Sequence, residues 1–102
     1  MKNILLICGG GASSGFMAAN MRKAAKKKKL DLNIQARSES ELEDHLDSTD
    51  ILLIGPHLSY MEDDIKKQLG DRNIKVAVIP QIVYGPLDGQ KAIQMVLDME
   101  ND

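Results

Sequence analysis

The chain has 102 residues, of which 43% are hydrophobic and 27% charged, and its formal net charge is −2. This length suits a single domain with one core and is too short for a cofactor-binding domain joined to a substrate domain. The slightly acidic balance argues against a general nucleic-acid binder, and no apolar run approaches the ~20 residues of a membrane span. We therefore expect one domain over residues 1–102, cytoplasmic, not inserted in a membrane and with no nucleic-acid partner.

Four short apolar runs predict β-strands. They are Ile4–Ile7, Leu32–Ala36, Ile51–Ile54 and Ile74–Ile79. The first and third runs are continuously apolar, which is typical of strands buried on both faces of a parallel sheet. The second and fourth runs alternate more, so we expect them nearer the edges of that sheet.

Amphipathic segments lie between these runs and predict helices. The first follows Ser13 and Ser14, and the lysines at positions 26–29 lie at its end, where they complement the helix dipole. Ser-x-x-Glu spacings that begin at Ser38 and at Ser40 predict a capping box for a second helix.

Two more helices complete the pattern. A third helix has an apolar face from Leu58 to Leu69, with Gly70 as its C-cap, and Asp88 is predicted to cap a last helix. The alternation of strands and helices predicts an α/β fold with right-handed crossovers and helices on both faces of the sheet. We expect a small, doubly wound, flavodoxin-like domain with four parallel strands in the order 2-1-3-4.

The loop after the first strand predicts a phosphate site. Its predicted phosphate-binding residues are Gly9, Gly10, Gly11, Ala12, Ser13, Ser14 and Gly15. Three consecutive glycines can aim successive backbone N–H groups at one point, which forms an anion nest. The helix that follows adds its free N–H groups and the positive end of its dipole.

Cys8 begins this loop and is the only cysteine of the chain. Cysteines at helix N-termini titrate at roughly 3.5–7.5 instead of 8.5, so the same groups would stabilise a thiolate. We predict that Cys8 is the catalytic nucleophile and forms a cysteinyl phosphate. A buried core cysteine beside a plain tight turn is the alternative interpretation. The position at the carboxyl edge of a parallel sheet, where ligands bind, favours the nucleophile.

The loop differs from familiar phosphate loops. A Walker motif would need Lys and Ser or Thr where Phe16 and Met17 stand. The tyrosine-phosphatase loop would need arginine where Ser14 stands, and without it the loop should hold phosphate while hydrolysing it poorly. A small cysteine-dependent phosphatase and a non-catalytic anion-binding module remain the alternative functions. Turnover of an aryl phosphate and the alkylation rate of Cys8 would distinguish them.

With these residues the chain resembles the cytoplasmic IIB components of the bacterial sugar phosphotransferase system, of the lactose/cellobiose (chitobiose) class. The resemblance covers nearly the whole length and rests on the Cys8 loop, on Leu53–Met61 and on Val83–Gly89. The family loop often reads Cys-Ser-x-Gly-Met-Ser-Thr. Gly9 and Ala12 depart from it, and one hydroxyl donor is lost.

The resemblance implies a phosphotransferase that works as a phosphoryl carrier. Cys8 would accept a phosphoryl group from a phosphohistidine of enzyme IIA. It would pass the group to a β-linked disaccharide (cellobiose, lactose or chitobiose class) held by the membrane enzyme IIC. No nucleotide, metal or other cofactor is expected, and a monomer is expected because one face must meet both partners.

Three further residues are accessory candidates because they follow strands at the same edge. His57 would be a proton or hydrogen-bond partner of the phosphoryl group, although an ordinary loop histidine is the favoured interpretation. Tyr60 and Tyr84 are expected to pack over the cysteine loop rather than to face a partner.

Overall fold

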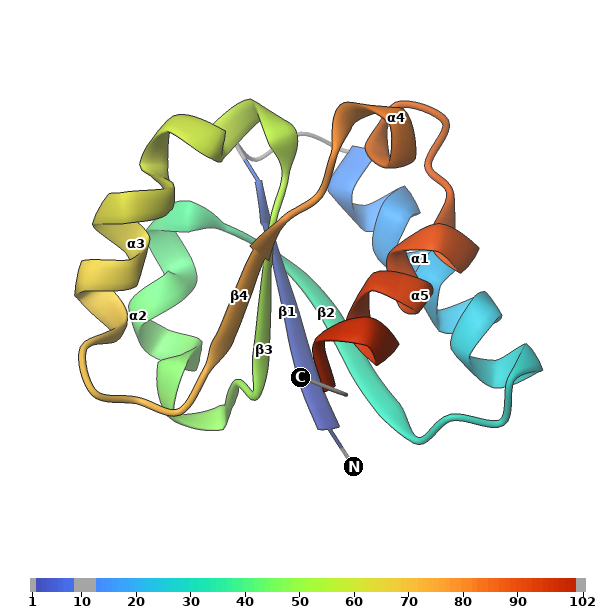
Figure 1. The fold of residues 1–102 in the computed structure, drawn as a ribbon, viewed down its shortest axis with the longest axis horizontal. Coiled ribbons are helices and arrows are strands. Elements are labelled where there is room, and N and C mark those ends of the chain that lie inside the picture. Colours follow the sequence, from blue (N-terminus) through green and yellow to red (C-terminus); the bar gives the residue numbers. More distant parts are fainter. Residues whose placement is uncertain (1, 9–12, 101–102) are drawn as a thin grey trace.

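Four parallel strands form one sheet in the order β2-β1-β3-β4, as the sequence predicts (Figure 1). The computed structural model describes residues 2–8 and 13–100. The strands are β1 (Lys2–Cys8), β2 (Leu32–Ser38), β3 (Ile51–Ile54) and β4 (Lys75–Val78). The two continuously apolar strands, β1 and β3, lie at the centre, and the two alternating strands lie at the edges.

Helices cover both faces of the sheet (Figure 1). One face carries α1 (Ser13–Lys27) and α5 (Gly89–Glu100), and the other carries α2 (Leu42–His45) and α3 (Glu62–Leu69). A one-turn helix, α4 (Gln81–Tyr84), follows β4. Three 3-10 turns complete the order: η1 (Glu39–Glu41), η2 (Leu46–Ser48) and η3 (Pro56–Met61).

The alternation of side chains along the central strands builds two hydrophobic clusters. In β1, Ile4 and Leu6 pack in the cluster of α1 and α5, whereas Leu5 and Ile7 pack in the cluster of α2 and α3. Successive side chains of a strand point to opposite faces, so a run of apolar residues supplies both clusters. This explains why β1 and β3 contain no polar residue between Ile4 and Ile7 or between Ile51 and Ile54.

The predicted helix ends are partly confirmed. Asp88 caps α5, since the backbone N–H of Lys91 donates to Asp88 Oδ1 at 3.1 Å. Gly70 ends α3 with a φ of +61°, the left-handed region that favours glycine.

The predicted capping box is wrong. Ser38 is the last residue of β2, and its hydroxyl shares a hydrogen bond of 2.8 Å with the Ser40 hydroxyl and makes no capping bond. The helix expected there is instead a short α2 between two 3-10 turns. The turn α4 was not predicted either, because the segment before Gly85 has too few residues to show a helical period.

The two helices on one face touch at a glycine. A Cβ atom on Gly89 would lie 2.3 Å from the carbonyl carbon of Asn20 and 2.7 Å from the backbone nitrogen of Met21. The Asn20 side chain also donates from Nδ2 to the carbonyl of Leu87 at 2.8 Å, and Leu87 has a φ of +56°. The segment between α4 and α5 is therefore held directly against α1.

None of the helices in residues 2–8 and 13–100 combines the length and hydropathy that a membrane span requires.

Candidate functional site

Cys8 is the last residue of the central strand β1. It is paired with Ser38 of β2, and the preceding residue, Ile7, is paired with Ile54 of β3. The thiol is free and the residue is only 2% exposed. The cysteine side chain is therefore covered almost completely by neighbouring groups.

The predicted phosphate loop is only partly described. Gly9, Gly10, Gly11 and Ala12 lie outside the described residues. Ser13 begins α1, Ser14 is buried at 8% exposure, and Gly15 is exposed with open space where a Cβ would stand.

The electrostatics of α1 suit an anion at its N-terminus. The first turn contains no acidic residue, and the last turn carries Lys26 and Lys27. No carboxylate on this turn opposes the positive end of the helix dipole, which favours negative charge.

Gly55 lies against Cys8 from the neighbouring strand. It follows β3, and its backbone N–H donates to the carbonyl of Ile7 at 2.9 Å, which continues the sheet by one residue. A Cβ on Gly55 would lie 3.1 Å from the Cβ of Cys8 and 3.7 Å from Cε2 of Tyr84. Its φ is −63°, a value open to any residue, so lack of space, and not backbone conformation, explains the glycine.

Tyr84 is the other residue that lies near the Cβ position of Gly55. It is the last residue of α4, is 3% exposed, and belongs to the core cluster of α1 and α5. The ring of His57 stands edge-on to it, with centroids 5.3 Å apart and planes at 79°. Tyr84 is buried and His57 stands against its ring, whereas most of the loop over which Tyr84 is expected to pack, residues 9–12, lies outside the described residues.

Sequence reasoning missed Gly55. The only signal was a glycine between a buried strand and Pro56, which reads as an ordinary turn. Its contact with Cys8 arises only when β3 pairs with β1.

Tyr60 does not pack over the cysteine loop, and that prediction is wrong. It is 78% exposed, whereas Leu58 of the same turn and Ile65 of α3 are buried in the cluster of α2 and α3. Phe16 on α1 and Ile82 on α4 are also exposed, at 64% and 74%. Each of the three lies in the segment that follows a strand. In Figure 1 the N-terminus of α1, the turn before α3 and α4 all stand at the edge where β1 ends.

We call Phe16, Tyr60 and Ile82 the apolar rim. Among the described residues they are the large hydrophobic side chains with most of their surface exposed. Their elements stand at one edge of the sheet (Figure 1), which makes the three side chains candidates for contact with other molecules.

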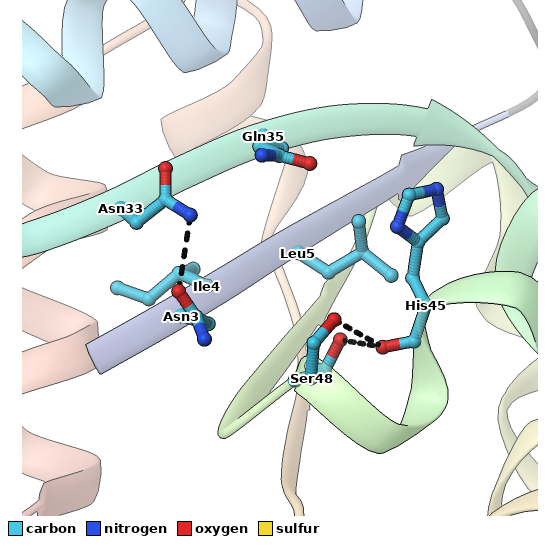
Figure 2. Close-up of a pocket in the computed structure, with 8 residues that line it drawn as sticks. Asn3, Ile4, Leu5, Asn33, Gln35, His45 and Ser48 are labelled. Atoms are coloured by element: carbon cyan, nitrogen blue, oxygen red, sulfur yellow. Dashed lines mark hydrogen bonds between the residues drawn. The ribbon is translucent and has the colours of Figure 1, made fainter. Parts of the chain in front are cut away.

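A polar cavity of about 70 Å³ lies elsewhere, between the sheet and η2 (Figure 2). The Asn33 side chain donates to Asn3 Oδ1 at 3.0 Å, and the Ser48 hydroxyl donates to the carbonyl of His45 at 3.1 Å. Asn3 and Asn33 are near the amino ends of their strands, so this cavity is distant from Cys8. Its polar groups satisfy one another, and we assign it no chemistry.

The arrangement around Cys8 suits group transfer better than binding of a large ligand. The hollow beside the site, lined by residues that include His57, Tyr84 and Leu87, has a volume of about 220 Å³, less than the roughly 300 Å³ at which small-molecule pockets begin. A single phosphoryl group needs far less room than a sugar. The cysteine and the N-terminus of α1 belong to this edge of the sheet, and the elements that carry the apolar rim stand at the same edge.

Comparisons with known proteins agree on one family. The family described as "PTS system, Lactose/Cellobiose specific IIB subunit" matches residues 3–95. The oligo-beta-mannoside-specific EIIB component of Bacillus subtilis is 31% identical over 99 residues, which cover 97% of this chain and 96% of that protein. The lactose-specific IIB domain of Streptococcus pneumoniae has the same fold, with a TM-score of 0.87 at 18% identity and 96% of each chain covered.

In one relative the matching segment is part of a larger protein. The lactose-specific EIICB component of Staphylococcus epidermidis is 26% identical over 98% of this chain, which corresponds to 18% of that protein.

Proposed function

Because the chain belongs to the lactose/cellobiose-specific IIB family of the sugar phosphotransferase system, we propose that Cys8 carries the phosphoryl group in its transfer reaction. IIB components are phosphotransferases, so the open questions are which residue reacts and with which partners. The observation that carries the proposal is the position of Cys8, the last residue of the central strand, before the N-terminus of α1.

The first half-reaction forms a thiophosphate. The sulfur of Cys8 attacks the phosphorus of a phosphohistidine on enzyme IIA, the S–P bond forms, and the N–P bond breaks. The proton of the thiol ends on the imidazole nitrogen that leaves, so atoms and charge balance. Such a loose transfer depends mainly on positioning and on stabilisation of the three phosphoryl oxygens. We assign that role to the loop from Gly9 to Gly15, with the Ser13 and Ser14 hydroxyls.

The second half-reaction discharges the carrier. A hydroxyl of a β-linked disaccharide on enzyme IIC attacks the phosphorus, the O–P bond forms, and the S–P bond breaks. The hydroxyl proton returns to the sulfur. The joining of the equivalent segment to IIC in a relative supports IIC as the acceptor partner. We propose a cytoplasmic monomer that offers one face to IIA and then to IIC.

Mapping the phosphoryl group tests this proposal. The protein is incubated with phosphoenolpyruvate, the general phosphotransferase proteins and IIA proteins of the lactose/cellobiose class, and then analysed by intact mass and fragmentation. We expect a gain of one phosphoryl group on the peptide that contains Cys8. A group mapped to His45 or His57, the two histidines of the chain, would contradict the proposal. Steady release of inorganic phosphate without any partner would indicate a phosphatase instead.

The apolar rim supplies a second prediction, which concerns partner binding. In a Tyr60→Ser variant the half-saturating concentration of phosphorylated IIA should rise at least about fivefold, because exposed tyrosines at interfaces often supply more than 1 kcal/mol. The maximal rate should change less than about twofold, and the melting temperature should not change, because the side chain is exposed. Gln68→Ser, an exposed change at the far end of α3, is the control. If Tyr60→Ser and the parent react at equal rates at all concentrations of phosphorylated IIA, the apolar rim is excluded from the contact with IIA.

A further inference from the structure

The contacts around Cys8 point to a residue that positions it. We propose that Tyr84 is a positioning residue for Cys8, and that the missing side chain of Gly55 allows it to act. The proposal rests on the proposed function, since it concerns the transfer at Cys8. Tyr84 would not touch the phosphoryl group; its ring would hold the cysteine side chain at the carboxyl end of β1.

The first step of the argument is a shared space. The point where a Gly55 Cβ would stand is 3.1 Å from the Cβ of Cys8 and 3.7 Å from Cε2 of Tyr84. The aromatic ring and the base of the cysteine therefore approach Gly55 together, and both are nearly fully buried. Because Gly55 has no side chain, both groups border the same space beside it, and we infer that the Tyr84 ring packs at the base of Cys8.

The second step is that this wall is fixed. The backbone N–H of Tyr84 donates to the carbonyl of Pro80 at 2.9 Å, and the carbonyl of Tyr84 accepts from the N–H of Leu87 at 2.9 Å. The Asn20 side chain then ties the carbonyl of Leu87 to α1. The tyrosine is thus attached, through Leu87 and Asn20, to α1, the helix that follows the cysteine loop in the chain.

The third step concerns the outer edge of the ring. His57 stands edge-on to Tyr84 and is itself exposed, so it braces the ring on the solvent side. Edge-to-face aromatic pairs are worth about 0.5–1.5 kcal/mol beyond burial. Because His57 and Gly55 come from the same turn after β3, one segment both makes room for the ring and supports it.

Positioning of this kind affects the rate of a transfer more than the binding of the donor. A displacement of the nucleophile by about 1 Å can cost about a hundredfold in rate. In a Tyr84→Leu variant the maximal rate of phosphoryl acceptance should fall about tenfold or more, while the half-saturating concentration of phosphorylated IIA stays within about twofold. Tyr84→Phe keeps the ring and should retain the rate within about threefold.

The control separates positioning from general destabilisation. Val83→Ala removes buried side-chain volume from the same turn of α4 but leaves the ring, and it should lower the melting temperature without lowering the maximal rate. If Tyr84→Leu reacts at the parental rate, or if Val83→Ala loses as much rate, the proposal is overturned.

Gly55→Ala tests the other side of the same contact with a single substitution, and if Tyr84→Leu fails to fold, a parental rate in Gly55→Ala overturns the proposal. Its Cβ would press on Cys8, so the maximal rate should fall at least about fivefold. In the double variant with Tyr84→Leu, the added methyl group gains room, so the two losses should not multiply; residues in contact show such coupling. If the loss of maximal rate in the double variant equals the product of the losses in the two single variants, Gly55 and Tyr84 act separately.

Alkylation keeps this inference separate from the proposed function. Tyr84→Leu should let iodoacetamide modify Cys8 at least about threefold faster than in the parent, because the proposed packing of the ring at the base of Cys8 is lost and the buried thiol becomes easier to reach. Val83→Ala should not change that rate. If the parent accepts no phosphoryl group, the proposed function falls, and alkylation alone judges the positioning: equal rates in the parent and in Tyr84→Leu would refute it.

Discussion

A Cys8→Ser variant is expected to accept no phosphoryl group from IIA, with a loss of at least about a thousandfold in rate. The serine hydroxyl is a far weaker nucleophile near neutral pH than a thiol, of which a few per cent is ionised even when it is unperturbed. Gly55 lies against Cys8 and Ser38 is its strand partner, and neither residue offers an imidazole or carboxylate that would compensate as a general base. Intact mass after incubation with the phosphorylated donor measures the effect.

Folding of this variant has to be checked, because position 8 is buried. A hydroxyl that finds no partner there costs roughly 1–3 kcal/mol, so the melting temperature should drop by a few degrees without loss of the fold. Cys8→Ala, which adds no polar group, is the matched control and should be equally inactive. A serine variant that is phosphorylated at near the parental rate would move the carrier role to another residue.

Gly89→Ala should destabilise the protein more than any other single methyl addition at a described glycine. The new Cβ would stand 2.3 Å from the Asn20 carbonyl carbon and 2.4 Å from its oxygen, and backbone atoms cannot move aside as a side chain can. The helices α1 and α5 must then separate, which we expect to cost about 3 kcal/mol in the free energy of unfolding. For a domain of this size that corresponds to a fall of more than about 10 °C in melting temperature.

Gly15→Ala is the matched control for this substitution. Gly15 is also in the first turn of a helix, but nothing lies within 4 Å of its Cβ position. Its melting temperature should be unchanged or slightly raised, since alanine favours helix over glycine. If Gly89→Ala has the same melting temperature as the parent, the close contact between α1 and α5 is not maintained in solution.

The sequence alone predicts the sheet, because the pattern of a strand is local. Continuous apolar runs at Ile4–Ile7 and Ile51–Ile54 suit only strands covered on both faces, which places them at the centre of the observed order. The position of Cys8 at the carboxyl edge follows from the same reasoning, because its strand ends there in a parallel sheet. The Asp88 cap is equally local, since it reaches a backbone N–H only three residues away.

Only the tertiary structure decides which distant residues meet. Gly55, Cys8 and Tyr84 come from three segments, and no periodicity in any one of them indicates that their atoms share a space. The same holds for Gly89 against Asn20. Tyr60 and Tyr84 look alike in the sequence, as tyrosines in segments that follow strands, yet one is exposed and the other buried. The sequence therefore determines the strand pattern and the edge of the sheet at which Cys8 lies, whereas packing between segments decides what surrounds the cysteine, because burial is a property of the whole chain and not of a local pattern.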